Sequence, residues 1–104
     1  MIIQGSNQPI VIRFGDDIKT NVSDLMVSLY TVGKVLKDWN MEDLNISGEN
    51  AVAGLTQEET AAFPTGACYI EIKWLDLDGI TQFNKIVKDQ IVYRSDKRIM
   101  EVGE

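Results

Sequence analysis

Apolar and polar residues alternate along most of this chain, with the period of two that is typical of half-buried strands. The runs that show it cover residues 10–14, 25–30, 35–39, 44–47 and 51–55, the last being the weakest. In the first run Ile10, Ile12 and Phe14 would share one face of a strand. Turn residues recur about every ten positions, which favours a sandwich or a barrel.

Residues 56–62 break the strand pattern and predict one short helix. Thr56 and Glu59 match a capping box, in which the Thr56 hydroxyl accepts from the Glu59 N–H while the Glu59 carboxylate accepts from the Thr56 N–H. Pro64 disfavours helix at Phe63. Glu58 and Glu59 are interpreted as capping residues and not as a general acid/base pair, because no opposing group is visible.

The strongest strand signal begins at Ala67. Alternate residues of this run are apolar and share one face: Cys68, Ile70, Ile72 and Trp74. The Asp78-Gly79 dipeptide predicts a two-residue type I′ hairpin turn after it.

That turn would place Trp74 opposite Phe83 and Lys85 opposite Ile72. Because Lys85 would then face the core, we expect a bulge near Asn84 and Lys85, or a longer loop, that returns Ile86 to the apolar face. We further expect a break at residues 88–89 and another short strand at 91–93. Residues 95–104 are expected to be a docking tail, which packs on its own domain or adds to a neighbour's sheet.

The composition excludes several kinds of chemistry. The chain has 104 residues, no histidine and one cysteine. Catalytic relays that use histidine, histidine-ligated zinc or haem, internal disulfides and thiolate zinc clusters are therefore excluded. Cys68 is interpreted as a buried, reduced thiol, because no histidine is available to activate it.

The charge balance also limits the partners. Sixteen acidic and ten basic residues give a net charge of -6 and a pI near 4.5. We therefore expect no nucleic-acid partner and no membrane partner. The N-terminus shows no signal peptide, and the longest apolar runs are far shorter than a membrane helix, so a cytosolic location is expected.

No residue is assigned a catalytic, cofactor-binding or metal-binding role. A calcium loop counted from Asp76 fails, because Gly79 comes two positions early and Val87 stands where glutamate is needed. The acidic pairs at 16–17 and 76–78 are interpreted as turns, whose carboxylates accept from nearby backbone amides.

The aromatic residues allow two interpretations. They could form a sugar-stacking platform, but Trp74 and Phe14 are in phase with core isoleucines, so a core role is favoured for both. Tyr30 and Tyr93 are the more available for a ligand.

Two resemblances follow from these segments. The order of strands, helix and tyrosine-bearing strand resembles an immunoglobulin-like antiparallel β-sandwich, in which Trp39 would be the core tryptophan and Tyr69 the buried corner tyrosine. No cysteine pair is present, so an antibody-type domain is excluded. The chain also resembles small bacteriophage and prophage tail proteins, including the N-terminal domain of baseplate upper proteins. This second resemblance rests on residues 15–17, 23–30, 55–60 and 66–74.

The chain length predicts one domain over residues 1–104, and the resemblance implies a non-enzymatic structural role for it. The expected partners are other phage tail or baseplate proteins and further copies of the chain. The expected location is the virion, or the bacterial cytoplasm when a prophage encodes the chain. Residues 67–104 carry seven acidic and six basic side chains, so this nearly neutral part is expected to meet a neighbouring subunit.

Two alternatives stay open. The first is a carbohydrate- or peptide-binding β-sandwich module with an exposed aromatic edge. The second is an enzyme that uses only carboxylates, which would need two facing groups about 5–10 Å apart in a groove.

Overall fold

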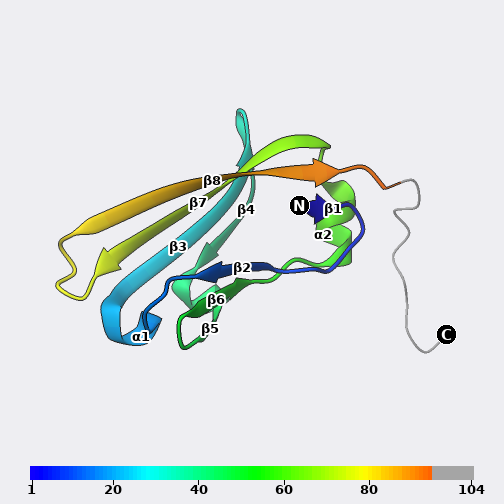
Figure 1. Ribbon diagram of the computed structural model, residues 1–104. Coiled ribbons are helices and arrows are strands. Elements are labelled where there is room, and N and C mark those ends of the chain that lie inside the picture. Colours follow the sequence, from blue (N-terminus) through cyan, green and yellow to red (C-terminus); the bar gives the residue numbers. More distant parts are fainter. Residues whose placement is uncertain (95–104) are drawn as a thin grey trace, which may run out of the picture.

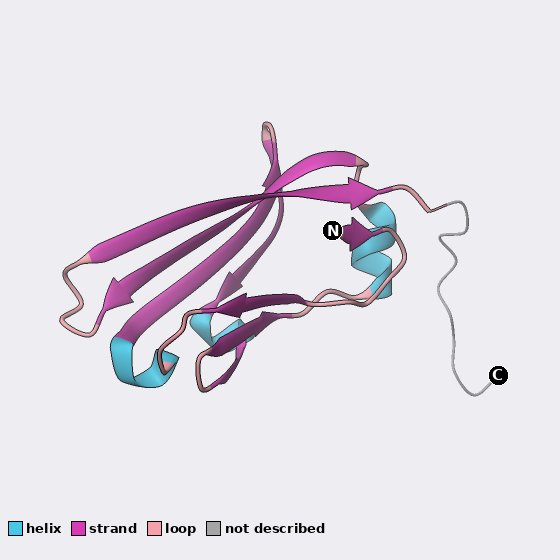
Figure 2. Cartoon of the chain, in the orientation of Figure 1, coloured by secondary structure: helices cyan, strands magenta, loops and turns pink. Residues whose placement is uncertain are grey.

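A computed structural model describes residues 1–94 of the chain (Figure 1). The expected docking tail, residues 95–104, lies outside the described residues. Most of the described chain is β-strand, as the alternating pattern predicts, and the strands form two sheets (Figure 2).

The larger sheet has five strands in the order β1-β8-β7-β3-β4. In chain order these are β1 (Ile2–Ile3), β3 (Val22–Thr31), β4 (Lys34–Asn40), β7 (Gly66–Asp76) and β8 (Gln82–Val92). The smaller sheet has three strands in the order β2-β6-β5, namely β2 (Ile10–Arg13), β5 (Asn45–Ser47) and β6 (Asn50–Ala53).

The expected antiparallel sandwich needs correction in two respects. The larger sheet is mixed, because β1 pairs with β8 in parallel. It also curls, and its arrangement with the smaller sheet is not clearly that of an immunoglobulin-like sandwich. The parallel strand β1 was not expected, since a two-residue strand is too short to show an alternating pattern.

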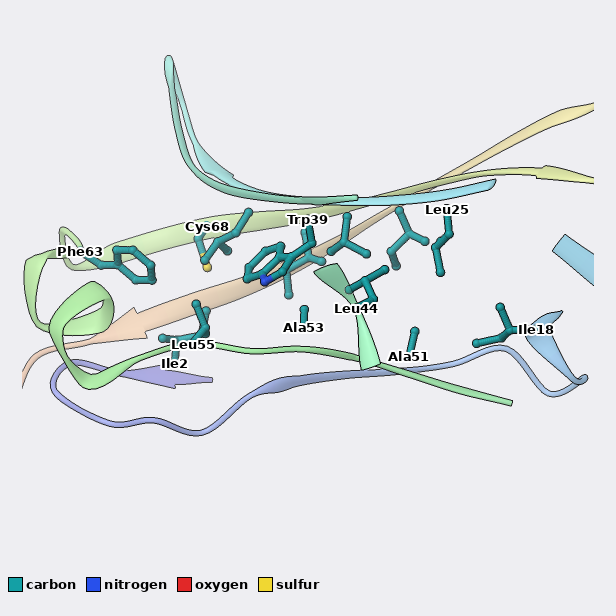
Figure 3. Packing of buried hydrophobic residues seen from close by; sticks show 14 of the residues in the cluster. Ile2, Ile18, Leu25, Trp39, Leu44, Ala51, Ala53, Leu55, Phe63 and Cys68 are labelled. Atoms are coloured by element: carbon teal, nitrogen blue, oxygen red, sulfur yellow. The ribbon is translucent and has the colours of Figure 1, made fainter. Parts of the chain in front are cut away.

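The core fills the space between the two sheets and has Trp39 near its centre. This side chain is 2% exposed, and its indole N–H donates to the Gly54 carbonyl oxygen at 3.1 Å. Figure 3 shows the ring in the same layer as Leu44, Ala53 and Cys68. The prediction that the 35–39 strand carries a large aromatic residue into the core is confirmed.

Helix α2 (Gln57–Ala62) matches the predicted short helix and its capping box. The Thr56 hydroxyl accepts from the Glu59 N–H at 3.1 Å, and Glu59 Oε1 accepts from the Thr56 N–H at 2.9 Å. Lys37 Nζ lies 2.7 Å from Glu59 Oε2. Burial raises the pKa of Glu59, but the bonds from Lys37 and Thr56 outweigh that effect and hold this pKa below its usual value.

Two further helical turns were not predicted. Helix α1 (Ile18–Asn21) begins where the sequence indicates only a turn, and Asp17 caps it by accepting from the Thr20 N–H at 3.1 Å. The carboxylate does satisfy a nearby backbone amide, as expected, but it starts a one-turn helix. The 3-10 helix η1 (Met41–Asp43) connects β4 to β5.

The β7–β8 hairpin keeps the predicted register with a different turn. Trp74 is opposite Phe83 and Ile72 is opposite Lys85. The loop has five residues, 77–81, instead of two, so the longer loop expected as the alternative to a bulge is present. The Asp76 carbonyl oxygen accepts from the Gly79 N–H at 2.9 Å, and the Asp76 N–H donates to Thr81 O at 2.9 Å.

The expected bulge in β8 is absent from the described register, which runs without a shift from Gln82 to Ile91. Ile86 therefore stays opposite Glu71 and is 53% exposed, so the expected return to the apolar face is wrong. The expected break at residues 88–89 is also wrong, because β8 continues to Val92. The bond between the Asp76 N–H and Thr81 O lies in the same register as the expected two-residue turn, so the longer loop leaves the register unchanged and Lys85 faces inward.

Candidate interaction surface

Among residues 1–94, strand β8 has one edge without a partner over most of its length. It pairs with β7 on one side, and on the other side β1 pairs only with Ile91 and Val92. Within the described part of the chain, residues 82–89 therefore form a free sheet edge. Exposed apolar side chains lie along it: Phe83 is 43%, Ile86 53% and Val87 39% exposed.

The peptide groups on this edge alternate in direction. The Asp76 N–H donates to Thr81 O, so the odd-numbered residues of β8 direct their N–H and C=O groups toward β7. Even-numbered residues of β8 consequently point their N–H and C=O groups to the free edge. The bond from the Gln4 N–H to Val92 O, which joins β1 to that edge, has the same parity. The free edge thus offers donors and acceptors at Asn84, Ile86 and Lys88 that no other described strand pairs with.

A groove of about 330 Å³ lies beside this edge, between β2 and the inner faces of β7 and β8. Its walls are mostly apolar and consist of Ile10, Val11, Ile12, Arg13, Phe14, Ile70, Ile72, Trp74, Lys85 and Val87. The connection through η1 links the sheets on the β4–β5 side, whereas no strand pairing joins β2 to β8 on the opposite side. The groove is the open side between the two sheets.

Two aromatic rings of the groove wall, Phe14 and Trp74, pack together with a third ring, Phe83. Trp74 lies 5.3 Å from Phe14 in an edge-to-face arrangement and 5.5 Å from Phe83 in a stacked one, both measured between ring centroids. Trp74 and Phe14 are partly buried and pack against the core. The predicted core role is therefore only partly right, because both rings also form the groove wall.

The other aromatic candidates lie elsewhere. Tyr30 and Tyr69 stack on the outer face of the larger sheet with centroids 5.5 Å apart. Tyr69 is therefore only partly buried and is not the buried corner tyrosine that the immunoglobulin-like resemblance implies. Tyr93 is 64% exposed and follows the end of β8.

The charges of β8 are few and mixed. Lys85 lies on the inner face opposite Ile72, and Lys88 lies on the outer face opposite Tyr69. Asp89 Oδ1 is 2.7 Å from the N-terminal ammonium of Met1. The whole chain has an excess of acidic residues, but β8 does not. Electrostatic repulsion between two copies of the chain is therefore weak at the β8 edge.

The remaining polar candidates have structural roles. Cys68 is fully buried, and burial followed by the nearby charge of Asp89 raises the pKa of its thiol. Asp78 accepts from the backbone N–H groups of Ile80 and Thr81 at 2.8 and 3.1 Å, as a turn residue does. Within residues 1–94 no cluster of three or more histidine, cysteine or acidic side chains is placed to hold a metal ion.

Helices of the described chain are all too short or too polar to cross a membrane. Comparison with models of known protein families, with curated proteins and with solved structures finds no match.

Sequence reasoning missed the β8 edge although a signal was present. The Asp78-Gly79 turn gave a register with Lys85 inward and Ile86 outward. That pattern was interpreted as a conflict to be removed by a bulge. It instead marks an edge strand whose inner face, over Lys85 and Val87, borders the open groove.

Proposed function

We propose that this chain is a non-enzymatic structural protein of phage or prophage origin, a tail or baseplate component that binds neighbouring proteins by strand addition at β8. The observation that carries the proposal is the free β8 edge, which combines unpaired peptide groups at alternate positions with exposed Phe83, Ile86 and Val87. Strand addition satisfies such peptide groups and covers such side chains at once.

The β8 edge has few of the features that protect sheet edges from pairing. Proteins block free edges with proline, bulges, very short strands or many charges. Over residues 82–90 the chain has no proline and no register shift, and only Lys85, Lys88 and Asp89 are charged. An edge that is long, regular and apolar in part is suited to binding another strand.

The finer parts of the proposal come from the resemblances. Two facing sheets with Trp39 between them support an immunoglobulin-like relationship. The resemblance to tail proteins supplies the partners, which are other tail or baseplate proteins, and the location, which is the virion or the cytoplasm of a bacterium that carries the prophage.

The test is mass spectrometry of phage particles released by the source bacterium after prophage induction and purified by density gradient. We expect the chain to copurify with tails in a fixed ratio to the major tail protein through successive gradients. A chain that stays with the soluble fraction, while tail proteins move with the particles, would contradict the structural role.

A carbohydrate- or peptide-binding module is the second candidate, because Trp74 in the groove wall stacks on Phe83, which is 43% exposed. Aromatic faces of this kind stack on sugars and apolar peptides. Glycan-array binding that is lost in Phe83→Ala and kept in Tyr30→Ala would support this candidate. An array without signal would count against the sugar form of it.

A further inference from the structure

We infer that a second copy of this chain occupies the β8 edge, in an antiparallel pairing that places Ile86 opposite Ile86 of the second copy. This inference deepens the proposed function, on which it rests, by naming one partner of the edge and the register of the contact. The two copies would form one continuous sheet with a two-fold axis at Ile86.

Hydrogen-bond direction restricts the possible registers. The outward peptide groups of β8 belong to even-numbered residues, as the bonds at Asp76 and Val92 indicate. In an antiparallel pair both residues of a hydrogen-bonded position must direct their peptide groups at each other. An even-numbered residue must therefore face an even-numbered residue of the second copy. In a symmetric pair this requirement puts the axis at the position of a residue, not between two residues.

The neighbouring elements restrict the length. The loop at residues 77–81 ends one side of the edge, and β1 occupies the other side from Ile91 onward. Met1 precedes Ile2 in the parallel pair and so lies beside Gln90. The second copy can pair along residues 82–89 without displacing the N-terminal strand.

Charge and length then select the axis. An axis at Lys85 or Lys88 would place two ammonium groups directly opposite each other, which is destabilising. An axis at Val87 would bring Asn84 of the second copy to Gln90, where Met1 lies. An axis nearer the loop would pair fewer residues. An axis at Ile86 avoids all of these conflicts and pairs residues 83–89 of each copy.

The side chains at this register are compatible. Ile86, which is 53% exposed, would contact its own counterpart on the outer face. On the inner face Lys85 would lie opposite Val87 of the second copy and diagonal to Asp89 of that copy, within reach of a long side chain. Because the contact is two-fold symmetric, every favourable pair occurs twice.

Cysteine scanning tests the register. Four single variants, Lys85→Cys, Ile86→Cys, Val87→Cys and Lys88→Cys, are oxidised with copper-phenanthroline, and the wild type serves as control because its Cys68 is fully buried. The distance between facing residues of a hydrogen-bonded pair, about 5.5 Å between Cα atoms, permits a disulfide. We expect covalent dimer mainly from Ile86→Cys. Dimer mainly from another position, or equally from all four, overturns the register.

Sedimentation equilibrium tests the association itself. We expect a wild-type dimer whose dissociation constant rises at least about tenfold in Ile86→Arg. Ile80→Arg is the matched control, because Ile80 is 84% exposed in the loop and outside the paired segment. Circular dichroism melts check that both variants fold. A wild type that stays monomeric at the highest soluble concentration, or equal weakening by both variants, overturns the inference.

Failure of this inference and failure of the proposed function are distinguishable. A monomeric chain that copurifies with phage tails would leave the structural role intact and remove the second copy as the partner of β8. A dimer with the predicted register that is absent from the particles would keep the second copy as the partner of β8 and remove the structural role in the tail.

Discussion

Replacing Trp39 with alanine should cost about 4–5 kcal/mol of unfolding free energy, and replacing Trp74 only about 2–3 kcal/mol. Trp39 is 2% exposed and surrounded by core residues of both sheets. A tryptophan side chain buries about 150–250 Å², which at about 25 cal/mol per Å² corresponds to roughly 4–6 kcal/mol. Truncation would leave an enclosed cavity, so the upper part of the usual range for such substitutions applies.

Trp74 should cost less because of its position on the groove wall. Part of its ring faces the groove, which is open to solvent, so truncation enlarges an existing space instead of creating a closed cavity. Trp74→Ala removes the partly buried area of the ring and its contacts with Phe14 and Phe83. Each of these two ring contacts contributes about 0.5–1.5 kcal/mol.

Urea denaturation followed by fluorescence and far-UV circular dichroism measures both costs, since each variant keeps the other tryptophan as a probe. The protein is kept dilute so that association does not add to stability. Unchanged m-values would show that both variants unfold from the same compact state. Equal costs for the two substitutions would show that Trp74 is as enclosed as Trp39 and that the groove is closed, which would refute this reasoning.

Three further predictions concern local features. Thr56→Ala should lower the unfolding free energy by about 1 kcal/mol through loss of the helix cap, as read from urea melts. Gly79→Val should cost at least about 1–2 kcal/mol, because Gly79 has a φ of +70°, whereas Gly54→Ala, at a site with open space and no positive φ, should stay within about 0.5 kcal/mol in the same melts. The backbone bonds to Asp78 hold its pKa below the usual 3.8. Its stabilisation is therefore fully present above that pH and is lost as the pH falls through the lower, folded-state pKa. Melts of wild type and Asp78→Ala across acidic pH should converge there; a gap that widens in acid would contradict the assignment.

The features that the sequence predicted well are local. The alternating runs identify most strands, and the Thr56–Glu59 capping box identifies α2, because each depends on residues a few positions apart. Strand β1 and helix α1 were missed for two different reasons. β1 depends on a parallel contact with Ile91 and Val92, far along the chain, and α1 is one turn whose Asp17 cap also suits a simple turn.

The candidate site shows where pattern reasoning fails physically. The rule that apolar residues face the core holds where a second layer covers the sheet, as it does over Trp39. Strand β8 is an edge strand beside an open groove, so Lys85 can face inward and Ile86 outward without burying a charge. Whether a strand lies at the edge depends on the sheet order, which adjacent residues do not encode.

Amide hydrogen exchange along β8, measured by NMR in dilute and in concentrated samples, tests the use of this edge most directly. The Lys85 and Val87 amides point toward β7 and should be protected in both samples. The Asn84, Ile86 and Lys88 amides point to the free edge and should exchange rapidly when dilute and become protected when concentrated. Protection that is independent of concentration at these three positions, or that changes instead along β4, would contradict assembly through β8.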